Sequence, residues 1–113
     1  MKRIATFIKM IPSGSGTVQQ RLYRLSHPLA PEQYDVDLGE YVPVDRGYGY
    51  IVVSASVIRY SGPETYIFGA DEDGKIVDWR ELRGSSRGHL NHDLALSDAG
   101  YSPAYEVEPL PAL

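Results

Sequence analysis

The chain has 113 residues, with eleven Lys and Arg, fifteen Asp and Glu, and no cysteine. This length fits one domain, and the lack of cysteine excludes a disulfide scaffold, a thiol nucleophile and thiolate-held metals. The net charge of −4 argues against non-specific nucleic-acid binding, which needs a basic surface. Nine tyrosines, eleven glycines and eight prolines indicate many turns and short strands.

Charge is divided unevenly along the chain. Residues 1–34 carry five bases and one acid, whereas residues 35–113 carry six bases and fourteen acids. Three interpretations stay open: the halves meet within one fold, they pair head to tail between two copies, or the surface is unevenly decorated.

The basic and apolar start resembles the beginning of a signal peptide. Lys9 interrupts the apolar run before it reaches the 7–15 residues of a secretory core. No stretch approaches the roughly 20 apolar residues that span a membrane. We therefore expect a soluble chain in the cytoplasm, without membrane association.

The first half of the chain predicts two strands and a long connection. Residues 4–11 are rich in Ile, Phe and Thr, and a loop follows over residues 12–16. Residues 17–25 fit either a helix, from the spacing of Val18, Leu22 and Leu25, or a strand. We favour a strand, because a hairpin with residues 4–11 closes only a short loop. Prolines, glycines and alternating acids predict an irregular connection over residues 26–47 that crosses the sheet.

The second half predicts a central strand followed by a hairpin. Residues 48–60 have apolar side chains in both alternating sets, which is typical of a strand covered on both faces. A turn follows at residues 61–64, and a strand at residues 65–70. The Asp73-Gly74 pair then predicts a tight turn before residues 75–79 resume the β pattern. Residues 80–82 suggest a single helical turn.

One helix is predicted over residues 92–99. Asn91 is a preferred N-cap residue, and Asp93 suits the positive end of the helix dipole. Gly100 stands where a left-handed C-cap residue belongs, with Tyr101 placed to pack back on Leu96.

These elements together predict an α+β fold. We expect a mainly antiparallel sheet of four or five strands, with the one helix packed on a face. Residues 1–101 form the domain, and residues 102–113 form an extended, proline-rich tail that docks on the sheet or hangs loose.

Metal sites find little support in the sequence. Residues 71–74 resemble part of a calcium loop, but aligning Gly74 with its glycine puts Gly69 and Arg80 at the terminal ligand positions. His89 and His92 offer two imidazoles close to the carboxylate of Asp93, and no further strong ligand lies nearby in the sequence. We expect neither a metal nor a cofactor.

An anion site is the alternative small-molecule hypothesis. The glycine- and serine-rich residues 84–88 precede the predicted helix, and Arg87, Asn91 and His92 are the candidate ligand-binding residues. The segment lacks the Lys-Ser or Lys-Thr of a P-loop. We therefore favour a plain connecting loop for this segment.

Tyrosine and arginine supply the candidate protein-binding residues. Tyr48, Tyr50 and Tyr60 fall on one alternating set of the predicted central strand. Arg21, Tyr23 and Arg24 fall on the predicted outer strand at residues 17–25. Aromatic and arginine side chains are enriched at protein interfaces, although half-buried tyrosines are also common on sheet surfaces.

From Val52 onward the sequence resembles small orphan proteins of actinobacterial bacteriophages, whose function is unknown. The resemblance is carried by the runs Val52-Val53-Ser54-Ala55 and Tyr60-Ser61-Gly62-Pro63-Glu64-Thr65-Tyr66-Ile67-Phe68, by Ala70-Asp71, Gly74, Trp79, Glu81-Leu82, Gly84-Ser85 and Arg87-Gly88, and by His92, Ala95-Leu96 and Ala99-Gly100-Tyr101. It implies no catalytic residue. It implies a phage gene product acting in the host bacterial cytoplasm.

Two functions remain as hypotheses. The first is a phage-encoded interaction module that binds a host or phage protein, with homo-oligomers as a further possibility. The second is a small-molecule or nucleotide binder, or a minor enzyme, with its anion site at the loop before the helix.

Overall fold

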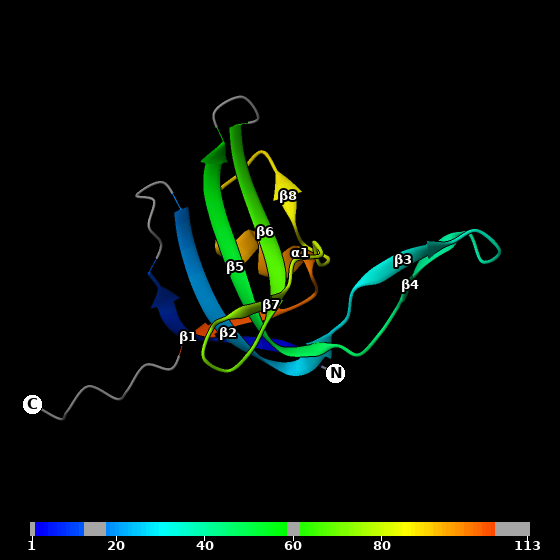
Figure 1. Ribbon diagram of the computed structural model, residues 1–113, viewed down its shortest axis with the longest axis horizontal. Helices are drawn as coiled ribbons and strands as arrows, with labels where there is room; N and C mark the ends of the chain where they lie inside the picture. Colours follow the sequence, from blue (N-terminus) through cyan, green and yellow to red (C-terminus); the bar gives the residue numbers. More distant parts are fainter. Residues whose placement is uncertain (1, 13–17, 59–61, 106–113) are drawn as a thin grey trace, which may run out of the picture.

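The computed structural model describes residues 2–12, 18–58 and 62–105 (Figure 1). Strands make up 59% of this part of the chain, and the one helix, α1 (His92–Asp98), has seven residues. The expected α+β fold with four or five strands is therefore wrong. The protein is mostly β, with a mixed seven-stranded sheet and a separate two-stranded sheet.

The large sheet has the strand order β7-β6-β5-β2-β1-β9, with β8 also paired to β6. Its strands are β1 (Ile4–Ile11), β2 (Val18–Leu29), β5 (Tyr48–Ile58), β6 (Gly62–Ala70), β7 (Ile76–Asp78), β8 (Ser86–Arg87) and β9 (Ser102–Tyr105). All neighbours are antiparallel except β9, which runs parallel to β1. The sequence pattern missed β8 and β9 because such short strands are created by their partners rather than by local periodicity.

Residues 18–29 form a strand, so the strand interpretation of residues 17–25 is confirmed and the helix is not. The side chains of Leu22 and Tyr23 are both fully buried, on opposite faces of the sheet. A strand buried on both faces mixes apolar residues in both alternating sets, and that mixture imitated helical spacing.

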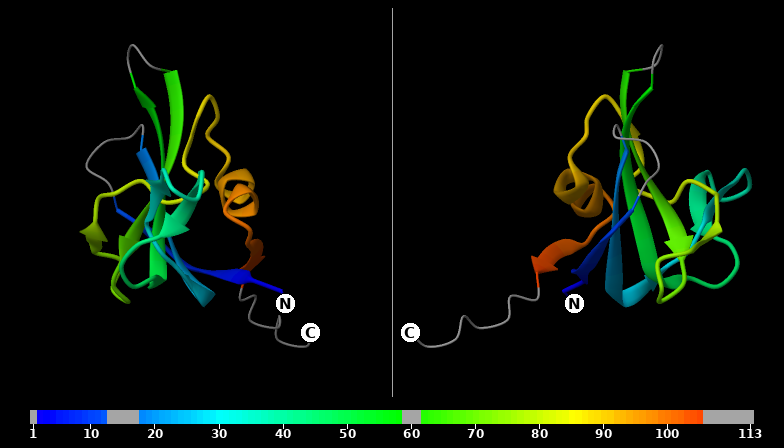
Figure 2. Two further views of the ribbon diagram at one scale, coloured as in Figure 1. Left: turned by 90° about the vertical axis from the view of Figure 1, so that its right-hand side faces the viewer. Right: turned by 60° about the vertical axis from the view of Figure 1, so that its left-hand side comes forward.

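The main core lies between the sheet and α1, which covers one face (Figure 2). Tyr23, Ile51, Val53 and Ile67 from the strands are fully buried there, against Leu96 of the helix. A smaller cluster of Leu22, Val52 and Ala70 lies on the other face. The tail predicted at residues 102–113 begins as β9, and residues 106–113 lie outside the described residues.

The caps of α1 match the sequence prediction. The Asn91 side chain accepts a hydrogen bond from the Leu94 N–H at 3.0 Å. Gly100 has φ +93°, and the Tyr101 N–H donates to the Leu96 carbonyl at 2.9 Å. The buried Tyr101 hydroxyl also donates to the His27 carbonyl at 2.6 Å, which ties the end of the helix to β2.

The irregular connection expected over residues 26–47 is wrong. Its first residues continue β2, and β3 (Glu32–Asp35) and β4 (Glu40–Pro43) form an antiparallel hairpin. The Val44 N–H closes this hairpin on the Pro31 carbonyl at 2.8 Å. We call residues 31–44 the arm, because they project from the body of the protein (Figure 1). The helical turn expected at residues 80–82 is likewise not formed.

Within the described part of the chain, no helix is long and apolar enough to cross a membrane.

We predict that Gly74→Ala destabilises the protein more than Gly100→Ala. Both glycines have φ +93°, so alanine at either position costs about 1 kcal/mol in backbone strain. A Cβ at Gly74 would also lie 2.6 Å from Ile11 Cδ1, whereas none of the surrounding atoms lies within 4 Å at Gly100. The extra repacking brings Gly74→Ala to about 2 kcal/mol. Urea unfolding measures both values, and equal losses would contradict the contact with Ile11.

Candidate protein-binding arm

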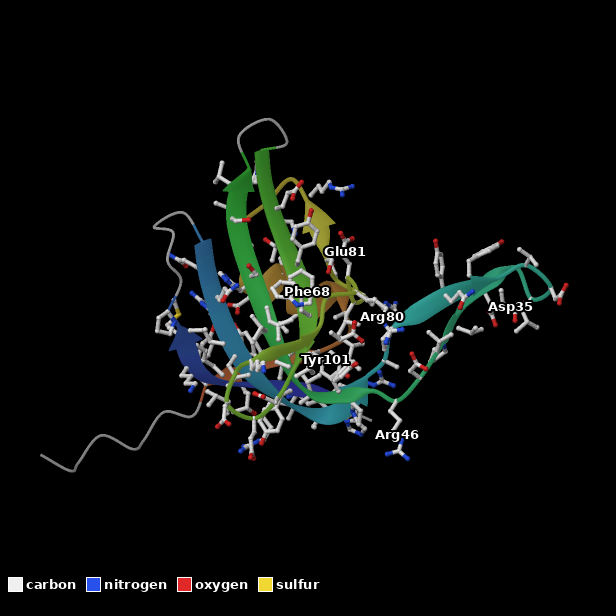
Figure 3. The ribbon with its side chains drawn as sticks, in the orientation of Figure 1. Asp35, Arg46, Phe68, Arg80, Glu81 and Tyr101 are labelled. Atoms are coloured by element: carbon white, nitrogen blue, oxygen red, sulfur yellow. The ribbon has the colours of Figure 1, made fainter. Side chains whose placement is uncertain are left out.

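The arm stands apart from the large sheet. β3 and β4 pair only with each other, and in Figure 3 Asp35 lies far out along the arm while Arg80 and Glu81 lie near its base. An isolated two-stranded hairpin is marginally stable in water. The structure of the arm therefore depends on hydrogen bonds and ring contacts within the hairpin and on the interactions that hold its base.

Local bonds order the tip of the arm. Asp35 Oδ1 accepts hydrogen bonds from the N–H groups of Asp37 at 2.9 Å and Leu38 at 3.1 Å, as in an Asx turn. The Gly39 N–H donates to the Asp35 carbonyl at 2.8 Å. Tyr34 and Tyr41 are directly opposite across the hairpin, with ring centroids 5.3 Å apart in an edge-to-face arrangement. Such an aromatic pair stabilises a hairpin by about 1 kcal/mol.

Large apolar side chains are exposed along the arm. The exposed fractions are 82% for Val36, 63% for Leu38, 66% for Tyr41 and 50% for Tyr34. Scattered exposed apolar residues are ordinary, but four on one projecting hairpin form a patch, and such patches mark interaction sites.

The arm is also acidic. Residues 31–44 contain four carboxylates, no Lys and no Arg. These carboxylates are Glu32, Asp35, Asp37 and Glu40, and Asp45 follows the arm directly. The arm therefore combines apolar contact area with a negative charge that favours a basic partner surface.

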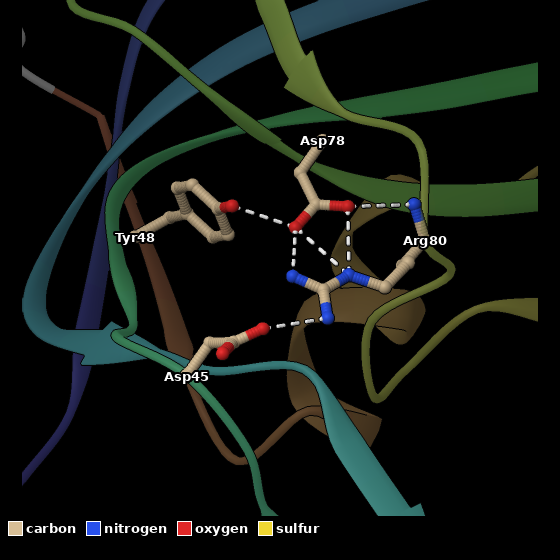
Figure 4. A network of polar contacts seen from close by, with 4 residues as sticks. All are labelled: Asp45, Tyr48, Asp78 and Arg80. Atoms are coloured by element: carbon tan, nitrogen blue, oxygen red, sulfur yellow. Dashed lines mark hydrogen bonds and ion pairs between the residues drawn. The ribbon is translucent and has the colours of Figure 1, made fainter.

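A polar network fastens the base of the arm to the body (Figure 4). Arg80 donates to both carboxylate oxygens of Asp78, from Nε at 3.0 Å and from Nη2 at 2.6 Å. Its Nη1 reaches Asp45, just beyond the arm, at 2.8 Å. Asp45 has φ +61°, an uncommon conformation for a residue other than glycine. One guanidinium thus links the end of β7 to the chain that leaves the arm.

Asp78 is the buried member of this network. Only 8% of its side chain is exposed, and the Tyr48 hydroxyl donates to its Oδ2 at 2.6 Å. The hydrogen bonds from Arg80, followed by the bond from Tyr48, hold the pKa of Asp78 well below its usual range. The same bond to Asp78 raises the pKa of the Tyr48 hydroxyl. Asp78 is therefore a fixed negative charge that positions Arg80.

The candidate protein-binding residues do not form one surface. Tyr23 is fully buried, and burial raises its pKa to about 12. Arg21 lies on the face covered by α1, whereas Arg24, three residues further along β2, lies on the other face. Tyr48 and Tyr50 pack against different clusters, because the register of β2 and β5 shifts near their ends. Tyr60 lies outside the described residues.

The candidate ligand-binding residues are divided as well. Asn91 caps α1, and His92 is buried with Nε2 3.1 Å from the Gln19 carbonyl oxygen. Burial lowers the pKa of His92. Both residues line a surface hollow with Arg21, a neighbour that the sequence did not indicate. Arg87 lines a different hollow and pairs with Glu64 at 3.3 Å.

Among the described residues, no group of three or more His, Cys, Asp or Glu side chains is placed to hold a metal.

Sequence reasoning missed the arm and the Arg80 network. The signal for the arm was present: residues 32–35 and 40–43 each carry a tyrosine, and a turn-forming Asp-x-Asp-x-Gly run separates them. The prolines at either end concealed this pattern. The pairing of Asp45 with Arg80, 35 residues apart, has no local signal.

Comparison with known protein families, with curated proteins and with solved structures yields no match.

We predict that Asp78→Asn destabilises the protein at neutral pH by about 2 kcal/mol, because a charged hydrogen-bond partner of Arg80 is lost. The folded pKa of Asp78 is depressed, so its carboxylate contributes stability above its unfolded pKa of about 4. That contribution disappears as the pH falls toward the folded pKa. The difference from wild type should therefore narrow below about pH 4, as measured by denaturant unfolding across pH.

The control for this prediction is Asp45→Asn. The Asp45 side chain is 65% exposed and bonds the same guanidinium, so its loss should cost below about 1 kcal/mol. Equal losses for the two variants would show that burial of Asp78 does not matter.

Proposed function

We propose that this protein is an interaction module that binds another protein through its arm. The observation that carries the proposal is the projecting hairpin with four exposed large apolar side chains. In the described structure each of these side chains keeps half or more of its area in contact with water. Contact with a partner removes their apolar area from water, and area of this kind drives most protein association.

The anchoring of the arm supports the same function. Arg80 holds Asp45 at its base, and the Asx turn at Asp35 orders its tip. A binding element that is ordered before it meets its partner loses less conformational entropy on binding. The acidic side chains around the apolar ones favour a partner with basic groups and would speed the encounter.

The sequence resemblance to actinobacterial phage proteins sets the context that we propose for this activity. A phage-encoded module of this kind binds a host or phage protein in the host bacterial cytoplasm. The exposed tip residues Val36 and Leu38 then take the place of the tyrosine row as the residues expected to contribute most to binding.

We predict that the double variant Val36→Asp with Leu38→Asp loses binding. The tagged chain, immobilised, should retain specific proteins from a lysate of its bacterial host supplemented with a differently tagged second copy. The variant should retain at least about tenfold less, because charged tip residues cannot be buried against a partner. Quantitative mass spectrometry of the retained proteins measures the change.

The matched control is Val57→Asp, which charges another exposed valine, 52% exposed, near the end of β5 that is further along the chain from the arm. It should retain the same proteins as wild type. Circular dichroism and unfolding curves check that all three chains are folded. Identical retention by the arm variant and wild type would refute the proposal.

A further inference from the structure

One segment of the large sheet carries an open edge. β9 pairs with residues 4–7 of β1, as in the pair Phe7 and Tyr105. Within the part of the chain that the structure describes, no strand pairs with residues 8–11 on that side. We call residues 8–11 the open edge. Unpaired N–H and C=O groups along such a segment are a template for another strand.

The side chains of the open edge are apolar and basic. Ile8 is 37% exposed and Met10 is 48% exposed, with the exposed Lys9 between them. Met10 is directly opposite Arg21 on β2. Residues 1–31 contain five Lys and Arg and no Asp or Glu, whereas the charged residues of the arm are all acidic. The two surfaces are therefore complementary in charge, and each offers apolar contact area.

The arm has an edge of similar length. β1 has a register shift between Phe7 and Lys9, so residues 9–11 are the regular part of the open edge. β3 contains four residues, and its outer side has no partner strand in the described structure. β3 contains no proline, whereas Pro43 removes one N–H donor from β4. β3 is thus the side of the arm with a full set of backbone donors and acceptors.

The arm and the open edge lie at opposite ends of the molecule. In Figure 1 the arm extends to one side along the longest axis, and the end of β1 lies on the other side. A chain cannot bring its own arm to its own open edge in this fold. Contact between them requires a second copy.

We propose that the arm of one copy docks on the open edge of the next, with β3 alongside residues 8–11 and the apolar tip against Ile8 and Met10. This inference rests on the proposed function and names the partner as a second copy of the chain. Because the two surfaces differ, the contact is head to tail, and it repeats to form a ring or a filament. The basic start and the acidic arm of the chain meet across this contact, as the uneven charge of the sequence allows.

Mass in solution tests the proposal. Light scattering during size-exclusion chromatography should give the wild-type chain a mass above 12.6 kDa that grows with concentration beyond two chains. The arm variant, Val36→Asp with Leu38→Asp, and an edge variant, Lys9→Glu with Met10→Glu, should each associate at least about tenfold more weakly. The Val57→Asp control should associate as wild type does.

Mixing the two variants gives the sharper test. The arm variant keeps an intact open edge, and the edge variant keeps an intact arm. An equimolar mixture should form dimers of one chain of each kind and nothing larger, because the remaining two surfaces are disabled. A mixture that stays monomeric, while both variants remain folded by circular dichroism, would overturn the pairing of these two surfaces.

Other outcomes separate this inference from the proposed function. A wild-type chain that stays monomeric at every concentration overturns it. A mass that stops at two chains, and that neither the arm variant nor the edge variant lowers, means a dimer through other surfaces and also overturns it. If the wild-type chain is monomeric but retains another protein through its arm, the interaction module stands and only the second copy is refuted.

Discussion

The buried carboxylate of Asp78 is the constraint on which the placement of the arm depends. A charge removed from water must be paired and hydrogen-bonded. Arg80 supplies three hydrogen bonds from its side chain and one from its backbone N–H at 2.9 Å, and Tyr48 adds another. Once Arg80 is fixed in this way, its remaining nitrogen holds Asp45. The exposed Asp45 is therefore held in place by an arginine that the buried Asp78 has positioned.

The large sheet and the arm are therefore stabilised by different interactions. The large sheet is stabilised by burial, with Leu22 and Tyr23 on opposite faces of a single strand and α1 covering one of those faces. The arm has no core of its own and depends on a tyrosine pair, an Asx turn and the network at its base. Charge and hydrogen bonding thus order the part of the chain that hydrophobic burial does not reach.

The same difference between the large sheet and the arm decides which apolar side chains are exposed. Most apolar side chains on β2 and β5 are buried, among them Leu22, Tyr23 and Ile51. On the arm, similar side chains are left exposed because nothing packs over a projecting hairpin. The side chains of Val36, Leu38 and Tyr41 are therefore among the large apolar groups that the described fold leaves in contact with water. A partner that covers them gains apolar contact without disturbing the core.

The sequence by itself determined the elements that depend on near neighbours. The strand at residues 4–11, the turn at Gly74 and both caps of α1 need only a few adjacent residues, and each was predicted. Tertiary structure decided the rest. β8 and β9 are too short to have a pattern of their own, and the register of β2 against β5 separated tyrosines that alternation had placed together. The arm and its anchor show the reason most clearly, because Asp45 and Arg80 are 35 residues apart in the chain and are brought together by the tertiary structure. Local sequence preferences act over a few residues, whereas the partner of a buried charge is fixed only by the complete tertiary structure.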